Sequence, residues 1–209
     1  MRAFIALVAF SGSVLVSSYA AAQTTPASVP SLQADVETVY TLPDGRQTHT
    51  TGRLYRSRSG QVREESSLGA VITDVAAGTI TILVTERKEA RVMTIPPDQR
   101  VRPAGAQGPR PDVFEETTIA GRRITKARME GPQGRRVEFW TAPDLGVVTW
   151  MKAEAGSMTT IRELRNLSTE EPSPAMFTIP ADYSVIEQEA KPGPDPRTVL
   201  PKRRGPGLQ

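Results

Sequence analysis

The chain has 209 residues, of which 38% are apolar, 5% aromatic and 23% charged, and it contains 18 prolines and 16 glycines with a formal net charge of +3. Cysteine is absent and histidine occurs once, at His49, which excludes disulfides, thiolate metal sites, cysteine nucleophiles and multi-histidine metal sites. The length fits one domain. The composition is too polar for a membrane protein, and the middle of the chain is too apolar for a disordered one. No metal site and no cofactor are expected.

Residues 1–22 are predicted to be a cleaved signal peptide. Arg2 supplies a positive charge, residues 3–16 form an apolar run of suitable length, and alanines precede a cleavage site after Ala22, which makes Gln23 the new N-terminus. The alternative is an uncleaved membrane anchor, but serine and glycine dilute the run below the length of a membrane span. Because no cysteine is available for lipid attachment, the mature chain is expected to be soluble, without a stable membrane span, and periplasmic or secreted.

Three segments are expected after the signal peptide: a flexible spacer at 23–33, a β domain at 34–187 and a disordered, proline-rich basic tail at 188–209. The domain alternates in hydropathy, is rich in β-branched residues and turns at short intervals. No window keeps an apolar stripe at helical spacing beyond about three turns, so few or no helices are expected. Residues 96–111 contain five prolines and two glycines, which predicts a loop that interrupts the domain.

The strands expected in this domain cover Asp35–Tyr40, Arg46–Arg58, Gln61–Ser66, Ala70–Val75, Thr79–Thr85, Ala90–Ile95, Asp112–Ala120, Arg122–Met129, Arg135–Thr141, Gly146–Ala153 and Ser157–Leu167.

The clearest local prediction is a hairpin over Val137–Ala153. Asp144-Leu145-Gly146 fits a three-residue loop that Gly146 closes in the left-handed conformation. The register then pairs residues whose numbers sum to 290. Aromatic pairs and opposite-charge pairs stabilise such ribbons, and both types fall in register here. The pairs are Trp140 with Trp150, Phe139 with Met151, and Glu138 with Lys152.

The hairpin has large apolar side chains on both faces. Phe139 and Met151 point to one face, and Trp140 and Trp150 point to the other, because side chains alternate along a strand. One face is expected to meet the domain core. The other needs a second packed layer of this chain, a lid, a partner or an apolar ligand. These four residues are therefore the candidate ligand contacts.

Motifs of known catalytic centres are absent from the sequence. His49 lies in an alternating strand without an adjacent carboxylate or nucleophile, as is typical of a solvated histidine, although a triad with a distant serine and aspartate stays open. The acidic doublets Glu64-Glu65, Glu115-Glu116 and Glu170-Glu171 offer carboxylates for hydrolysis, but neighbours on a strand point to opposite faces. No catalytic residue is assigned.

A basic stretch, residues 99–136, carries one aromatic residue, Phe114. Binding of single-stranded nucleic acid depends on several stacking aromatics. No nucleic-acid partner is therefore expected.

Several short phrases occur in a fixed order between about Arg46 and Ile186. They are residues 52–56 (GRLYR) with 60–64 (GQVRE), 72–74 (ITD), 118–121 (TIAG), 137–145 (VEFWTAPDL) and 174–183 (PAMFTIPADY). Through them the chain resembles uncharacterised exported bacterial proteins related to the outer-membrane lipoprotein-carrier (LolA/LolB-like) superfamily. The resemblance implies a single curved antiparallel sheet, a half-barrel whose concave face holds acyl chains or a peptide partner.

The leading hypothesis is a soluble periplasmic, non-enzymatic protein that binds an apolar ligand, a lipid or lipoprotein acyl chain, on the concave face of the sheet. The alternative is an envelope interaction or sensing module that uses exposed sheet edges and has no ligand pocket. A third hypothesis is a hydrolase with convergent carboxylates.

Overall fold

The computed structural model describes residues 30–96, 111–131 and 134–188. The predicted signal peptide and its cleavage site lie outside the described residues, as do most of the predicted loop at 96–111 and nearly all of the predicted tail.

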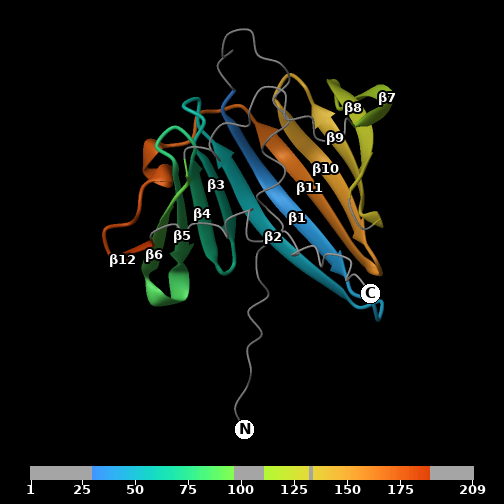
Figure 1. The fold of residues 1–209 in the computed structure, drawn as a ribbon. Helices are drawn as coiled ribbons and strands as arrows, with labels where there is room; N and C mark the ends of the chain where they lie inside the picture. The colour runs from blue at the N-terminus through green and yellow to red at the C-terminus, as the bar shows by residue number, and fades with distance from the viewer. Residues whose placement is uncertain (1–29, 97–110, 132–133, 189–209) are drawn as a thin grey trace, which may run out of the picture.

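The described residues form one twelve-stranded, curved, open sheet (Figure 1), so the predicted fold class, a mainly β half-barrel, is confirmed. The strand order is β12-β6-β5-β4-β3-β2-β1-β11-β10-β9-β8-β7. Neighbours are antiparallel except β12 and β6, which run parallel. The strands are β1 (Leu32–Thr41), β2 (Gln47–Arg56), β3 (Val62–Ser66), β4 (Gly69–Asp74), β5 (Thr79–Val84), β6 (Glu89–Thr94), β7 (Asp112–Ile119), β8 (Arg122–Glu130), β9 (Arg136–Ala142), β10 (Val147–Ala155), β11 (Met158–Ser168) and β12 (Ser184–Gln188).

The sheet consists of two meanders, β1–β6 and β7–β11, joined where β11 pairs with β1. All eleven predicted strands are present, with small differences at their ends. β1 begins at Leu32, inside the predicted spacer, because Ser31 and Leu32 are buried in the core. β12 was not predicted as a strand. It follows η3 (Pro174–Phe177), a short 3-10 turn like η1 (Thr85–Arg87).

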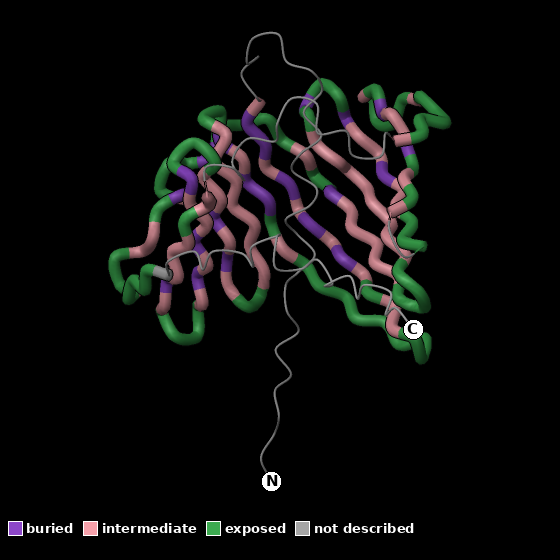
Figure 2. Tube along the Cα trace, in the orientation of Figure 1, coloured by how far each residue is buried: buried purple, intermediate pink, exposed green. Residues whose placement is uncertain are grey.

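Two apolar clusters stabilise the sheet, and Figure 2 shows their buried positions alternating along the strands. The first gathers residues of β1, β2, β8, β9, β11 and the β9–β10 turn around Leu32, Leu54 and Leu164. The second lies on β2 and β4–β6, where Phe177 of η3 belongs to the same cluster as Tyr55. Since Tyr55 and Leu54 are neighbours on β2, the segment with η3 covers the face of the sheet opposite to Leu54.

Gly52 marks a close approach between β2 and β3. It pairs with Ser66 in the ladder, and a Cβ atom at this position would overlap the backbone carbonyl oxygen of Glu65. A glycine inside a strand permits this approach because it has no side chain. Gly52 therefore allows the sheet to coil tightly at β2 and β3, within the first meander.

Candidate ligand-binding face

Arg56 identifies the concave face of the sheet. Its guanidinium donates to the carbonyl oxygens of Pro30 (Nε, 3.1 Å), Gly146 (Nη1, 3.2 Å) and Leu145 (Nη2). β2, which carries Arg56, is separated from β10 by β1 and β11, a distance of about 14 Å in a flat sheet. Contact between Arg56 and the β9–β10 turn therefore requires the sheet to curve toward the face from which Arg56 projects.

Two rows of paired residues run across this concave face, as the strand register defines it. The first runs from β12 to β1 and consists of Ile186, Arg91, Ile82, Val71, Glu64, Leu54 and Ala34. The second runs from β2 to β7 and consists of Thr50, Thr38, Arg162, Met151, Phe139, Ala127 and Val113. Because Ala34 and Thr38 are both even-numbered residues of β1, the rows share one face.

The concave face is apolar on both sides of its centre. Val71, Ile82 and Met151 are each half-buried, whereas Phe139 is almost fully buried. The segment with η3 covers the opposite face of β4–β6. Within the described part of the chain, nothing packs over Val71 and Ile82 to complete their burial.

Among the described residues, one ion pair crosses the centre of this face. Nη2 of Arg162 on β11 lies 3.0 Å from Oε2 of Glu64 on β3. The two strands are separated by β1 and β2. The side chains are 21% and 32% exposed, so water screens this pair less than the ion pairs at the surface.

The predicted hairpin is present with the predicted pairs, Trp140 with Trp150, Phe139 with Met151, and Glu138 with Lys152. Gly146 is left-handed, with φ of 57°. The predicted three-residue loop was wrong by one residue, since Ala142 pairs with Val147 and closes a four-residue turn. A bulge between Val148 and Trp150 inserts an extra residue into β10 and restores the predicted register.

The four candidate contacts divide between the two faces. Phe139 and Met151 lie in the concave row that contains Arg162. Trp140 and Trp150 lie on the convex face, with ring centroids 4.6 Å apart and an interplanar angle of 31°. Nζ of Lys126 lies 4.6 Å from the Trp140 ring centroid, a cation–π contact. Trp140 also packs against the first apolar cluster, so the tryptophans have partners within the chain.

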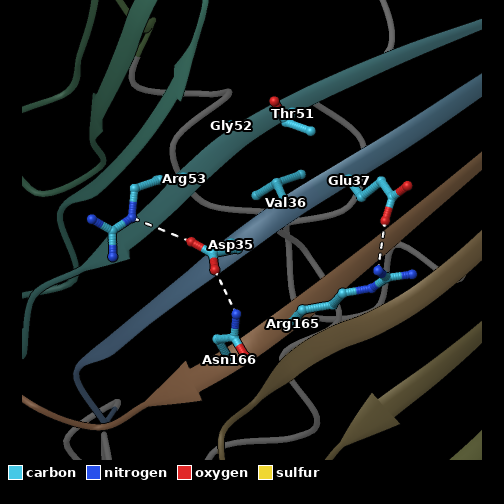
Figure 3. A pocket seen from close by; sticks show the side chains of 8 residues that line it. All are labelled: Asp35, Val36, Glu37, Thr51, Gly52, Arg53, Arg165 and Asn166. Carbon is cyan, nitrogen blue, oxygen red and sulfur yellow. Dashed lines mark hydrogen bonds and ion pairs between the residues drawn. The ribbon is translucent and has the colours of Figure 1, made fainter.

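The convex face also has a shallow hollow of about 430 Å³ across β2, β1 and β11 (Figure 3), and ion pairs and polar side chains line it. Arg53 Nε lies 3.4 Å from Asp35 Oδ1, and Asn166 Nδ2 donates to Asp35 Oδ2 at 2.7 Å. Arg165 binds Glu37 at 2.9 Å. The charged groups of the hollow are thus paired with one another.

The acidic and histidine side chains that the sequence offered for catalysis are not brought together at one site. Glu64 points to the concave face, while Glu65 binds Arg63 at 2.7 Å on the other face, as the alternation of a strand requires. His49 is exposed on β2. Among the described residues, no group of three or more histidine, aspartate or glutamate side chains is placed to hold a metal ion, and no helix is long and apolar enough to cross a membrane.

Sequence reasoning did not single out Arg56 or Arg162, and it considered Glu64 only as a member of the acidic doublet Glu64-Glu65. Each is a charged residue at an inward-facing position of an alternating strand, such as Arg162 between Thr160 and Leu164. That signal was present in the sequence, but its meaning depends on which strands face each other across the sheet.

The open sheet and its concave face place the chain in the class of curved antiparallel half-barrels. The resemblance expected from the sequence is confirmed at the level of the fold, since the chain has the curved antiparallel half-barrel that the resemblance implied. No protein-family model matches the sequence, and no curated protein matches it.

The comparison with solved structures finds similar chains at low sequence identity. An uncharacterized conserved protein from Thermus thermophilus is 8% identical with a TM-score of 0.55, over 77% of this chain and 91% of that chain. A LolA superfamily protein from Nitrosomonas europaea is 8% identical with a TM-score of 0.39, over 72% of this chain and 90% of that chain. MucB of Pseudomonas aeruginosa, solved in complex with MucA, gives 15% identity and a TM-score of 0.47 over 76% of this chain and 59% of that chain. At these identities the similarity concerns the fold alone.

Proposed function

We propose that this chain is an exported, non-enzymatic binding protein that holds the acyl chain of a lipid or lipoprotein on the concave face of its sheet. The observation that carries the proposal is the apolar surface at Val71, Ile82 and Met151, which the described residues leave half-buried. Burying such side chains against an acyl chain is favourable at roughly 25 cal/mol per Å² of apolar surface. An open half-barrel offers this surface to a long, flexible ligand.

Native mass spectrometry of the protein purified from a periplasmic extract, followed by solvent extraction, tests this proposal. We expect adducts in the lipid mass range and lipid in the extract. A clean apo mass together with a lipid-free extract would overturn the proposal.

Two isoleucine variants locate the ligand. Ile82 and Ile161 are both half-buried strand residues, but Ile82 lies on the concave face and Ile161 pairs with Val39 on the convex face. Ile82→Gln is expected to reduce the fraction of protein carrying lipid, and Ile161→Gln is expected to leave that fraction unchanged. Equal effects of the two variants would argue against the concave face.

A second candidate function rests on β7, the strand at one end of the sheet order. Val113 and Phe114 on this strand are 54% and 45% exposed, and an edge strand with exposed apolar residues can pair with a strand of an envelope protein. A photo-crosslinking amino acid at position 114, tested in intact cells, would give a discrete crosslinked protein if this function holds. Absence of that product would leave the edge without a role in partner binding.

A further inference from the structure

Arg162 and Arg165 lie three residues apart on β11, on opposite faces of the sheet, and they differ in how many carboxylates they bind. Arg165 on the convex face binds two, Glu37 at 2.9 Å through Nη1 and Glu163 at 2.8 Å through Nη2. Arg162 on the concave face binds one, Glu64, through Nη2. Within the described part of the chain, the Arg162 side chain makes no other hydrogen bond.

The arginine with fewer partners is also the less exposed. The Arg162 side chain is 21% exposed, whereas that of Arg165 is 56% exposed. A guanidinium has five N–H donors and matches carboxylates in a two-pronged geometry. Arg162 thus retains donor capacity in a setting where a charged hydrogen bond is stronger than it is at the surface.

The charges on the concave face favour an anion over a cation. In the sheet order from β6 across β1 to β10, the described residues of this face include three arginines and two glutamates. They are Arg56, Arg91, Arg162, Glu64 and Glu89. Arg91 binds Glu89 at 2.6 Å and Arg162 binds Glu64, so Arg56 has no carboxylate partner there. The excess positive charge lies beside apolar side chains.

We propose that Arg162 binds the carboxylate of a single-chain fatty acid whose acyl chain lies along the apolar concave face. This inference rests on the proposed function and adds the chemical class of the ligand. Arg162 is the fifth of the eleven residues of β11, far from either end of the strand, and Met151 and Thr38 flank it in the register. A carboxylate is small enough to lie at this central position, whereas a bulky phospholipid headgroup suits the rim of the sheet.

The binding of oleate and oleyl alcohol to the full mature chain, measured by isothermal titration calorimetry, tests the inference. The two probes share an acyl chain and differ in charge. We expect oleate to bind about tenfold more tightly, since a charge-assisted hydrogen bond contributes on this scale. Equal affinities would overturn the role of Arg162 and leave the proposed function standing. Binding of neither probe would contradict both.

Three variants separate recognition by Arg162 from a structural role. Arg162→Gln should lower oleate affinity about tenfold to that of the alcohol, with alcohol binding retained as evidence of folding. Arg165→Gln, the matched control on the other face, should change neither affinity. Glu64→Gln should tighten oleate binding, because it removes a competing negative charge from Arg162. Weaker oleate binding by Glu64→Gln, or a loss with Arg165→Gln equal to that with Arg162→Gln, would overturn the inference.

A lysophospholipid titration distinguishes the carboxylate from a phosphate. Lysophosphatidylglycerol carries one acyl chain and one phosphodiester charge. Weaker binding than oleate is expected, and tighter binding that depends on Arg162 would overturn the assignment to a carboxylate. If Arg162→Gln does not fold, the comparison of oleate with oleyl alcohol on the unmodified chain still decides the question.

Discussion

The guanidinium of Arg56 on β2 donates a hydrogen bond to the carbonyl oxygen of Leu145, 89 residues away in the β9–β10 turn. Further bonds to Gly146 and Pro30 make Arg56 a clamp between the two meanders at one end of the half-barrel. Burial lowers the pKa of this guanidinium, and the three carbonyl oxygens replace the water that it loses. We expect the curvature of the concave face to depend on this clamp.

Arg56→Met is therefore expected to lower the free energy of unfolding by about 2 kcal/mol or more, because it leaves carbonyl groups unsatisfied and removes charge-assisted hydrogen bonds. Urea denaturation followed by circular dichroism measures the change. The control is Arg58→Met. Arg58 is an exposed arginine in an ion pair with Glu171, and its replacement should change stability by less than about 0.5 kcal/mol. Equal losses would show that Arg56 is no clamp.

Gly52→Ala tests the close approach of β2 and β3. The new Cβ would overlap the carbonyl oxygen of Glu65, and overpacking of this kind lowers stability by about 1–3 kcal/mol. Thr51→Ala, at an exposed neighbouring position, serves as the control and should be nearly neutral. Thermal unfolding of the two variants side by side gives the comparison. A Gly52→Ala protein as stable as the unmodified chain would refute the role assigned to the glycine.

The β7–β8 turn offers a stabilising substitution. Ala120 and Gly121 have φ of 50° and 76°, the two left-handed residues of a type I′ turn. Alanine is strained in this region by roughly 1–2 kcal/mol, and asparagine tolerates it better. Ala120→Asn should therefore raise the free energy of unfolding by up to about 1 kcal/mol. No gain in urea denaturation would contradict the turn assignment.

The attachment of β12 should depend on pH. Lys88 Nζ lies 2.8 Å from Asp182 Oδ2, and this hydrogen bond lowers the pKa of Asp182 below its ordinary value of 3.8. A carboxylate whose pKa is lower in the folded chain stabilises the fold above its ordinary pKa, and the contribution is lost as the pH falls through the folded value. The pair is exposed, so the effect is local.

Titration of the backbone amide signal of Ser184 by NMR measures this effect, because that amide donates to the carbonyl oxygen of Lys88 at 2.8 Å. Its chemical shift should change below pH 3.8, the ordinary pKa of the Asp182 carboxyl, in the unmodified chain and much less in Asp182→Asn. The same response in both proteins would contradict the assignment.

The extent to which the sequence predicts this molecule depends on the range of the interaction. The Trp140–Trp150 pair was predictable because turn residues and cross-strand neighbours lie within one hairpin. The four-residue turn and the bulge before Trp150 were not predictable, because their one-residue shifts cancel and the predicted pairing of Trp140 with Trp150 is kept. β12 was not predicted for another reason, because its pairing with β6 joins segments that are distant in the sequence.

The candidate site also depends on long-range contacts that local sequence patterns do not predict. Alternation placed Phe139 and Met151 on one face and the tryptophans on the other. Which face is concave follows only from the order of the strands, with β11 beside β1. The Arg162–Glu64 pair joins residues 98 positions apart. Local patterns in the sequence do not contain that information.

The most direct test of the central claim is photo-crosslinking with a diazirine-labelled fatty acid, followed by peptide mass spectrometry of the full mature chain. Binding on the concave face predicts crosslinks to residues such as Ile82, Phe139 and Met151, and none to Trp140 or Trp150. Crosslinks confined to the tryptophans or to the edge strand β7 would contradict the account.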